Sequence, residues 1–431
     1  MTYGDYSIKD GHLYISGVDC VYLAQKYSTP LYVMSEDVVR ANCREFKGAL
    51  EKYYDSCGLI TYASKAFCTK EMCRIVNSEG LGLDAVSGGE LYTAREAGFP
   101  MEKINYHGNN KTDEEIKMGV DFGVGRFIAD NETELEKIDR YARESGRVQK
   151  VLIRVTPGVD AHTHDFIKTG QIDSKFGMAI ETGAADRITD FALTLKNIEL
   201  SGLHCHIGSQ IFEKEPFVET ARVMLDYINA VEERTGIEFE DLVLGGGFGI
   251  KYVEGDDPFS YDEMLKEVLT YVKKRREDEG KKLLHLGFEP GRAIAGPAGV
   301  TLYTVGNVKE IPDIRTYVSV DGGMTDNPRY ILYGADYTFI VANRADECAD
   351  KPCTVCGKCC ESGDMLGENV MLSGNVKSGD ILAVTSTGAY NFSMASNYNR
   401  VPRPPVVFVK DGQDFLAVRR ETLADLCERD I

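Results

Sequence analysis

Short apolar runs, separated by polar segments of helical period, dominate residues 58 to 290. Eight such runs occur in this stretch, at 59–63, 82–86, 104–106, 126–129, 151–155, 203–206, 242–244 and 286–289. Short apolar runs of this kind are typical of buried parallel strands. Eight strands that alternate with helices are what a (β/α)8 barrel requires. The pattern therefore predicts an α/β fold built on a TIM barrel.

The segments between these runs carry helix signals. Residues 87–90 have the spacing of a capping box, and Gly98 with Pro100 ends the helix that follows. Apolar residues recur at helical spacing after Asp130, and again within 217–228 and 265–272. Stripes of this kind are typical of helices that pack on a core.

The two flanks of this region have strand character. Residues 300–345 and 370–419 are rich in Val, Tyr, Thr and Ile, with Gly and Asp-Gly turns, and residues 11–34 resemble them. We therefore expect a discontinuous β domain, similar to a sandwich or barrel, made of residues 1–34 and 293–431. The barrel domain is expected at 35–292, entered through a helix with an apolar stripe from Val39 to Tyr53.

Composition narrows the possible partners. The chain has 431 residues, which suggests two domains, and a net charge of -19, which disfavours nucleic acid and anionic lipid as partners. No apolar stretch approaches the ~20 residues of a membrane span. The N-terminus has neither a basic region nor an apolar run, so we expect no signal peptide and a cytoplasmic protein. The twelve cysteines are then expected to be mostly reduced thiols.

Polar residues and glycines follow nearly every predicted strand. In chain order they are Lys65, Asp84, His107, Arg154, His206, Ser209, Gly245, Gly246, Gly247, Glu289 and Arg292. Taken singly, each has an ordinary interpretation: a solvated lysine, a structural histidine, a turn or a surface ion pair. Barrel active sites, however, lie at the carboxyl ends of the strands. Because these residues gather at that one end, the pattern favours a functional site.

Three of these features together point to one cofactor. Lys65 follows a buried strand between small residues, where a lysine can form an imine. The glycines at 245–247 offer bare backbone amides after strand seven, the usual phosphate site of this fold, and Arg292 is a plausible anion ligand beside them. Glu289 can pair with a protonated pyridine nitrogen. This combination predicts pyridoxal 5'-phosphate.

The motifs also resemble a known family, the barrel-fold pyridoxal-phosphate decarboxylases that include diaminopimelate, ornithine and arginine decarboxylases. The resemblance extends from about residue 28 to 400 and is greatest to the diaminopimelate branch. It is carried by segments 62–66, 87–91, 107–111, 202–210, 245–249, 289–292, 360–364 and 388–390. Each motif is short, but their order along the chain is highly specific.

The resemblance implies roles around the cofactor. Lys65 would form the imine, His206 would stack on the ring, and Glu289 would pair with the pyridine nitrogen. The phosphate would be held by Ser209, Gly245, Gly246, Gly247, Gly291 and Arg292. Tyr390 would lie near phosphate and substrate, with Asp84 and Arg154 as supporting groups.

The resemblance also implies a substrate and a partner. Arg292, Arg329 and Tyr333 would grip the distal head group of the substrate, and Glu361 would take its amine. Cys360 would protonate the carbanion left by CO2, from the neighbouring subunit of a homodimer with shared active sites. Two arginines and a carboxylate suit a far end that carries both charges. We therefore expect decarboxylation of meso-2,6-diaminopimelate to L-lysine.

Two departures from the family pattern leave alternative functions open. Tyr330 follows Arg329 where the family usually has proline, and Cys353, Cys356 and Cys359 precede Cys360. Four cysteines at this spacing could bind zinc or an iron–sulfur cluster, but we expect no metal, with Cys360 catalytic and the others as neighbouring thiols. The remaining alternatives are a decarboxylase of L- or D-ornithine, lysine or arginine, a related racemase, and an inactive regulator.

Overall fold

In this computed structural model the chain is described over residues 4–159 and 174–431. Residues 1–3, at the start of the segment considered for a signal peptide, lie outside these ranges. The chain divides into two compact units: Asn42–Gly249 with Asp257–Ala293, and Thr2–Ala41 with Ile250–Asp256 and Ile294–Ile431. The first boundary lies within helix α2 (Glu36–Tyr53).

Eight parallel strands form the closed sheet of the first unit, which confirms the predicted (β/α)8 barrel. In chain order they are β5 (Gly58–Ala63), β6 (Gly82–Ala85), β7 (Ile104–Tyr106), β8 (Arg126–Ala129), β9 (Gln149–Thr156), β11 (Ile198–His204), β12 (Asp241–Val243) and β13 (His285–Phe288). Each pairs with its neighbour in sequence, and β13 pairs with β5 to close the ring. A short strand, β10 (Met178–Ala179), pairs with the carboxyl end of β9.

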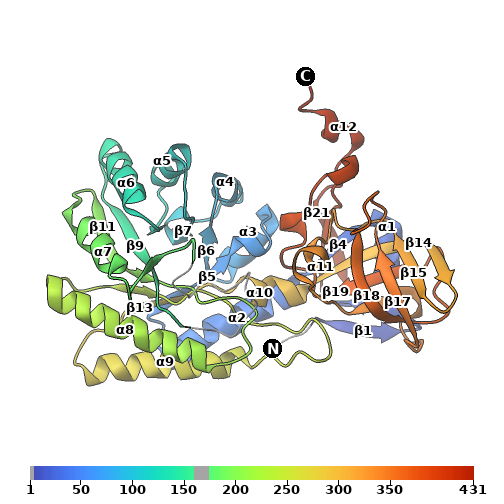
Figure 1. The fold of residues 1–431 in the computed structure, drawn as a ribbon, viewed down its shortest axis with the longest axis horizontal. Coiled ribbons are helices and arrows are strands. Elements are labelled where there is room, and N and C mark those ends of the chain that lie inside the picture. The colour runs from blue at the N-terminus through green and yellow to red at the C-terminus, as the bar shows by residue number, and fades with distance from the viewer. Residues whose placement is uncertain (1–3, 160–173) are drawn as a thin grey trace. The chain divides into compact units, whose positions relative to one another are not determined.

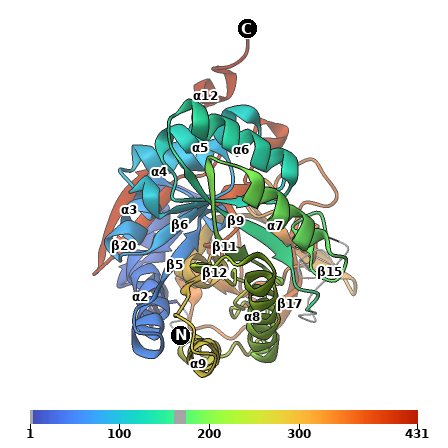
Figure 2. The ribbon, with the colours of Figure 1, turned by 90° about the vertical axis from the view of Figure 1, so that its left-hand side faces the viewer.

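Helices cover the outside of this barrel, as Figure 2 shows. They are α3 (Lys70–Ser78), α4 (Gly88–Glu96), α5 (Asp113–Phe122), α6 (Glu132–Glu144), α7 (Ala184–Thr194), α8 (Glu215–Thr235) and α9 (Tyr261–Asp278). Their ends follow the expected capping chemistry. The Ser87 side chain accepts a hydrogen bond from the Glu90 amide at the start of α4, and Gly98 lies beyond its end with φ of 75°. Of the helices within the described ranges, none is long and apolar enough to cross a membrane.

Close packing of backbones and apolar side chains fixes the barrel. Ile128, Leu152 and Val243 form a buried apolar cluster contributed by three strands. Gly202 lies in β11, where a Cβ atom would come within 2.0 Å of the Asp241 carbonyl oxygen. Only glycine therefore fits at this position of the strand.

The second unit is built on a mixed sheet, as the sequence predicts. Its strands run in the order β18 (Met365–Leu372), β17 (Lys351–Cys356), β15 (Arg315–Val320), β14 (Gly299–Ile311), β4 (Leu31–Ser35), β20 (Val406–Lys410) and β21 (Gln413–Val418). Strand β14 pairs with β4 and with β19 (Ile381–Thr385) in its first half and with β15 in its second half, and β16 (Phe339–Val341) pairs with β19. A small antiparallel sheet of β1 (Tyr6–Lys9), β2 (His12–Ile15) and β3 (Val18–Asp19) precedes it. Figure 1 shows these elements.

Two parts of this unit differ from the sequence prediction. Residues Cys20–Tyr27 form helix α1 within a stretch expected to be strands. The reason is that Asp19 caps the helix, accepting a hydrogen bond from the Val21 amide at 2.7 Å, and Leu23 with Ala24 joins the apolar core. Strand β17 lies in the cysteine-rich stretch that the prediction left unassigned. Short helices α10 (Arg292–Ala295), α11 (Arg329–Tyr333) and α12 (Leu423–Cys427) complete the chain.

Shortening a side chain of the barrel cluster tests how closely this core is packed. Leu152 is fully buried, so Leu152→Ala is expected to lower the free energy of unfolding by about 2–5 kcal/mol. Val148, just before the same strand, is 58% exposed, and Val148→Ala should change it by less than about 0.5 kcal/mol. Urea denaturation followed by circular dichroism measures both values. Equal effects of the two substitutions would contradict the packing described here.

Candidate active site

The predicted site residues of the barrel lie at the carboxyl ends of their strands. Lys65 stands on the 3-10 turn Ser64–Ala66 directly after β5, and its side chain is exposed. Asp84 lies near the end of β6, and His107 follows β7. Arg154 lies near the end of β9, and His206 follows β11. In a closed parallel barrel these ends form one rim, so the structure gathers these groups.

Glu289 is the centre of a buried cluster at this rim. Its Oε2 atom lies 3.0 Å from Nε2 of His204, and its Oε1 atom lies 3.1 Å from Nε2 of His107. The same His107 nitrogen is 3.6 Å from Oδ1 of Asp84. All four side chains are at least nine-tenths buried. Two carboxylates and two imidazoles therefore share one desolvated space.

Burial and mutual charge set the protonation of this cluster. Burial opposes the charged form of His107, but Glu289 and Asp84 outweigh it and raise the pKa of His107 to about 9. Burial lowers the pKa of His204 to about 4. Burial would raise the pKa of Glu289, yet its contacts with the two histidines hold that pKa well below the ordinary value. At neutral pH Glu289 is thus an anion, His107 a cation and His204 neutral.

Asp84 is less acidic than an ordinary aspartate. Burial and the nearby charge of Glu289 raise the pKa of Asp84 to about 6. The carboxylate also receives a weak hydrogen bond from Nδ2 of Asn105 at 3.4 Å. Asp84 supports the positive charge of His107 at the same Nε2 atom that Glu289 contacts.

The three glycines after β12 form a close-packed backbone turn. A Cβ atom at Gly246 would lie 2.2 Å from the Glu289 carbonyl oxygen, and one at Gly245 would lie 2.7 Å from the Cys205 carbonyl oxygen. Gly247 has φ of 105°, and its Cβ would meet the Gly208 carbonyl oxygen at 2.6 Å. No other residue fits these positions, so bare backbone is enforced beside the rim.

Charged and polar groups border this turn. Arg292 is buried and donates a hydrogen bond to Oγ of Ser209 at 2.9 Å, which joins two residues predicted to hold a phosphate. The Gly246 amide donates to Nδ1 of His206 at 3.3 Å. Gly291, the other predicted phosphate residue, lies against Ala63, and a Cβ atom at Gly291 would lie 3.0 Å from the Cβ atom of Ala63. The backbone amides and the guanidinium together suit a bound anion.

Arg154 and His206 lie in the same charged surroundings. Arg154 packs over the ring of Phe176, with 4.4 Å from its guanidinium carbon to the ring centroid. Burial lowers the pKa of His206 well below its ordinary value, and the positive charges of Lys65 and Arg154 add to this effect. His206 is therefore neutral at physiological pH and presents an aromatic ring rather than a charge.

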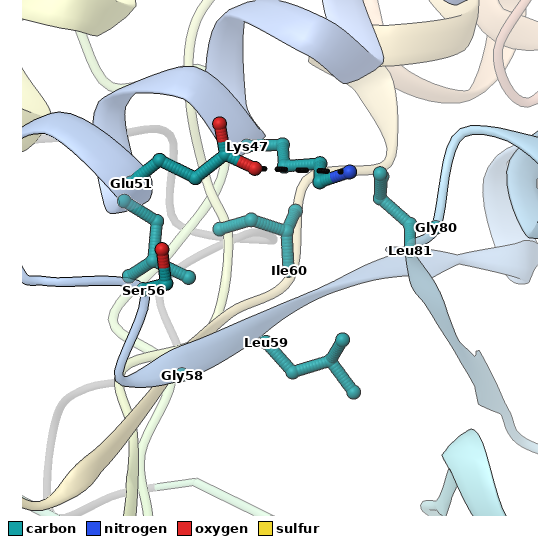
Figure 3. Close-up of a pocket in the computed structure, with 9 residues that line it drawn as sticks. Lys47, Glu51, Ser56, Gly58, Leu59, Ile60, Gly80 and Leu81 are labelled. Atoms are coloured by element: carbon teal, nitrogen blue, oxygen red, sulfur yellow. Dashed lines mark ion pairs between the residues drawn. The ribbon is translucent and has the colours of Figure 1, made fainter.

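A small pocket lies at the opposite ends of the strands. It is lined by residues before and within β5 and before β6, among them Lys47, Glu51, Gly58 and Leu81 (Figure 3), with a volume of about 140 Å³. Lys47 and Glu51 form an ion pair across its edge at 3.7 Å. The amino ends of barrel strands contribute to stability rather than catalysis, so this pocket is separate from the rim described above.

In the second unit, Arg329 is surrounded by tyrosines. Its guanidinium is buried, and it donates to the hydroxyls of Tyr337 at 2.6 Å and Tyr252 at 3.1 Å. The rings of Tyr333 and Tyr390 lie 6.0 and 5.9 Å from its central carbon. The structure thus brings together three predicted site residues: Arg329, Tyr333 and Tyr390. Over residues 4–159 and 174–431, no carboxylate forms an ion pair with Arg329.

The Cys360–Glu361 segment is an exposed loop that a buried aspartate organises. Asp364 accepts hydrogen bonds from the amides of Met324 at 2.6 Å and Cys359 at 2.7 Å. The Cys360 amide donates to Oδ1 of Asn399 at 2.9 Å. Both Cys360 and Glu361 have exposed side chains, so they are available to a partner or substrate.

The other cysteines of this region have different surroundings. Cys353 is buried in β17 as a small core residue, and Cys356 lies 3.4 Å from Oγ of Ser319. Within the described part of the chain these thiols do not converge to metal-ligand distances. The group whose ligand atoms do lie within 4.8 Å of one another is His107, His204 and Glu289, and the histidine–carboxylate contacts account for that spacing without an ion.

Sequence reasoning missed three contributors to these sites. His204 is the last residue of β11 and lies two residues before His206, and this short spacing is the signal that could have indicated it. Tyr252 and Tyr337 were also missed, since no local pattern relates either to Arg329. His107 was noted only as a residue after a strand.

Comparisons with known proteins identify the family of the chain. The sequence model of the family described as "Pyridoxal-dependent decarboxylase, pyridoxal binding domain" matches residues 36–296. A diaminopimelate decarboxylase of Bacillus subtilis is 47% identical over 424 residues, covering 98% of this chain and 95% of that protein. One from Bacillus methanolicus is 48% identical over 414 residues, covering 95% of each.

A solved structure is similar over the whole length. The diaminopimelate decarboxylase of M. jannaschii in complex with L-lysine has a TM-score of 0.93 and 36% identity, covering 100% of this chain and 99% of that one. The chain belongs to the family of pyridoxal-dependent decarboxylases. Within that family it groups with the diaminopimelate decarboxylases, which confirms the resemblance found in the sequence.

The residues present fit the cofactor of this family, pyridoxal phosphate. The glycine turn leaves no space for side chains, and Arg292 with Ser209 supplies a cation and a hydroxyl beside it. Glu289 is a buried anion whose Oε1 and Oε2 atoms lie against His107 and His204. A buried anion of this kind suits a protonated ring nitrogen.

The charge of His107 makes stability depend on pH. Its pKa is about 9 in the folded chain and 6.5 without the protein environment, so its contribution is complete below pH 6.5 and is lost as pH rises through 9. The unfolding free energy of the wild type should therefore exceed that of His107→Gln at pH 6.5. This excess should fall by on the order of 1–3 kcal/mol between pH 6.5 and 9.5. Urea denaturation at a series of pH values measures this difference. A difference that stays constant across that range would show that His107 is not a cation in the folded protein.

Proposed function

We propose that this chain removes one carboxyl group of meso-2,6-diaminopimelate as CO2 and produces L-lysine. The observation that carries this proposal is the similarity, at 47–48% identity over almost the whole chain, to diaminopimelate decarboxylases. Among the predicted substrate residues, Arg329, Tyr333 and Tyr390 lie together. The reaction is then a step of lysine biosynthesis.

The barrel rim would hold pyridoxal phosphate. When bound, the cofactor supplies an electron sink for the electron pair that remains after CO2 leaves. Lys65 would bind it covalently, and His206 would lie against its ring. Its phosphate would be held by Ser209, Gly245, Gly246, Gly247, Gly291 and Arg292. Tyr390 would lie near phosphate and substrate.

Three acidic and basic groups would complete the cofactor site. Glu289 would pair with the ring nitrogen, and its anionic state supports that role. Asp84 and Arg154 would act as supporting charges. The neutral state of His206 suits contact with an aromatic ring rather than with a charge.

Arg329 would bind the distal carboxylate of the substrate. It is a buried cation whose neighbours are tyrosines, and a desolvated guanidinium with no carboxylate partner among the described residues favours an anionic ligand. Arg292 and Tyr333 would contribute to the same grip. Glu361 would take the distal ammonium, so both charges of the far end find a partner.

Cys360 would return a proton to the carbon that has lost CO2. Its exposed position on a loop held by Asp364 is consistent with access to a substrate. We propose that this loop serves the barrel of a neighbouring subunit in a homodimer. Exposed apolar side chains on α11, namely Ile331, Leu332 and Tyr333, support a subunit contact in this part of the chain.

The remaining assignments follow from charge and chemistry. With a net charge of -19, the partners proposed are the amino-acid substrate and a second copy of the chain, not nucleic acid or a membrane. We propose a cytoplasmic location, where biosynthetic enzymes with free thiols operate.

A panel of amino acids tests the substrate. CO2 release from meso-diaminopimelate should exceed that from L- or D-lysine, ornithine and arginine by at least about 100-fold in kcat/KM, because the others leave the Arg329 charge without its carboxylate. Tyr330, whose hydroxyl lies 3.5 Å from Oε2 of Glu368, and the cysteine-rich segment before Cys360 are the departures that keep another diamino acid as the alternative. Faster turnover of any of these than of diaminopimelate would replace the proposed substrate.

Mixing two inactive variants tests the shared site. Lys65→Ala should be inactive and should take up no cofactor that borohydride can fix, and Cys360→Ala should lose most activity. If each site combines Lys65 of one subunit with Cys360 of its partner, random mixed dimers restore about one quarter of wild-type activity. Activity is measured after the two proteins are dissociated and reassembled together. A mixture no more active than its parents would mean that each site lies within one subunit.

A further inference from the structure

The Glu289 carboxylate is held from two directions by histidines on different strands. His204, at the end of β11, contacts Oε2 at 3.0 Å, and His107, after β7, contacts Oε1 at 3.1 Å. The two imidazole rings lie edge to face, with centroids 4.9 Å apart and planes at 70°. The Glu289 amide also donates to the Gly245 carbonyl at 2.8 Å. Both carboxylate oxygens and the backbone of this residue are therefore fixed.

The surroundings of the two histidines differ. Two carboxylates approach one nitrogen of His107, since its Nε2 atom is 3.6 Å from Asp84 and 3.1 Å from Glu289. His204 contacts one carboxylate oxygen, and its Nδ1 atom is buried with no hydrogen-bond partner among residues 4–159 and 174–431. Two adjacent imidazoles in a desolvated space are not both charged when only one of them has two carboxylates close to it. This geometry puts the positive charge on His107.

The remaining charged and titratable groups around these histidines agree with that division. Electrostatic interactions with His107 or His204 also come from Asp130, Glu90 and Arg154. Asp130 and Glu90 are carboxyl groups that favour a cation at His107, whereas Arg154 disfavours one at His204. Apart from Glu289, which contacts both rings, these groups thus supply negative charge to His107 and positive charge to His204.

We propose that His204 and His107 are positioning residues for Glu289 with separate tasks. His204 donates from Nε2 as a neutral imidazole and fixes the direction of the carboxylate, and His107 supplies the positive charge that keeps it anionic. The inference rests on the proposed pairing of Glu289 with the cofactor ring nitrogen. It assigns to His204, two residues before the motif residue His206, a role distinct from ring stacking.

The two tasks predict different tolerance to substitution. The amide of glutamine reaches the position of a histidine Nε2 and can donate the same hydrogen bond, whereas asparagine, one methylene shorter, cannot reach it. His204→Gln should therefore keep the dissociation constant of pyridoxal phosphate within about threefold of wild type. His204→Asn and His204→Leu should each weaken it by about 10- to 100-fold, the range expected for a lost hydrogen bond to a charged group.

A double-mutant cycle on the full-length protein tests whether His204 acts through Glu289. The cofactor is removed, and pyridoxal phosphate binding is then titrated by absorbance for wild type, His204→Leu, Glu289→Gln and the double variant. If His204 acts through Glu289, adding His204→Leu to Glu289→Gln should weaken binding by no more than about threefold further. Losses that multiply would overturn the inference. If His204→Leu does not fold, the glutamine and asparagine variants decide, and equal binding by those two would overturn it.

The same measurements separate this inference from the proposed function. Unchanged binding by Glu289→Gln would remove the role of Glu289 itself, and the inference with it. Weaker binding by Glu289→Gln beside normal binding by His204→Leu would leave the function intact and overturn the positioning role alone.

A matched control comes from the other end of the barrel. Nδ1 of His285 pairs with Asp241 at 3.1 Å at the amino ends of β13 and β12. His285→Leu should leave pyridoxal phosphate binding within about twofold of wild type. A loss equal to that of His204→Leu would mean that any lost histidine–carboxylate pair weakens the site, which overturns a specific role.

Nitrogen-15 NMR measures the protonation of the ring nitrogens of His107 and His204 directly, without an activity assay. The chain has seven histidines, and His204→Gln and His107→Gln assign the two signals of interest. At pH 7 His107 should show two protonated ring nitrogens, and His204 should show a proton on Nε2 only. A protonated His204, or a neutral His107, would overturn the division of tasks.

Discussion

Closure of the parallel sheet is the constraint on which the functional geometry depends. Because β13 pairs with β5 and every strand runs the same way, all eight carboxyl ends meet on one rim. Residues as distant in sequence as His107, His204 and Glu289 then lie within hydrogen-bonding distance. The ring closes only where backbones approach closely, as at Gly202, so glycine positions are as necessary to the site as the polar groups are.

The charged groups on that rim are buried, and losing their contact with water costs free energy. Pairing groups of opposite charge offsets this cost. An isolated buried carboxylate would take up a proton, but Glu289 stays ionised because His107 provides a cation beside it. Asp84 in turn supports His107. The protonation state of each group is therefore a property of the cluster, and removing one member changes the others.

The second unit stabilises a buried cation in a different way. Arg329 is buried against tyrosine hydroxyls and rings rather than a carboxylate, so its charge is stabilised without being neutralised. The loop with Cys360 is fixed by the buried Asp364, which accepts hydrogen bonds from backbone amides. The side chains of Cys360 and Glu361 remain exposed. Rigid support beneath exposed functional groups is typical of binding loops.

The sequence by itself determined the fold class, the family and the cofactor. Apolar runs of strand length repeat eight times, and a barrel follows because period and count are local properties of the chain. Lys65, Gly245–Gly247 and Glu289 could be selected because each follows a predicted strand, at the end of the barrel where active sites lie. Helix α1 was predicted wrongly, since its residues also suit a strand, and the Asp19 cap with packing on the core decides between the two.

Only the tertiary structure decided how these residues influence one another. No local pattern relates His204 to Glu289, or Tyr252 and Tyr337 to Arg329, because these pairs come from separate strands and loops. The same is true of charge: the sequence contains two histidines at the rim, and the carboxylates around each decide which one carries a proton. Electrostatic interactions depend on distance in space and on burial, and both quantities exist only once the barrel has closed.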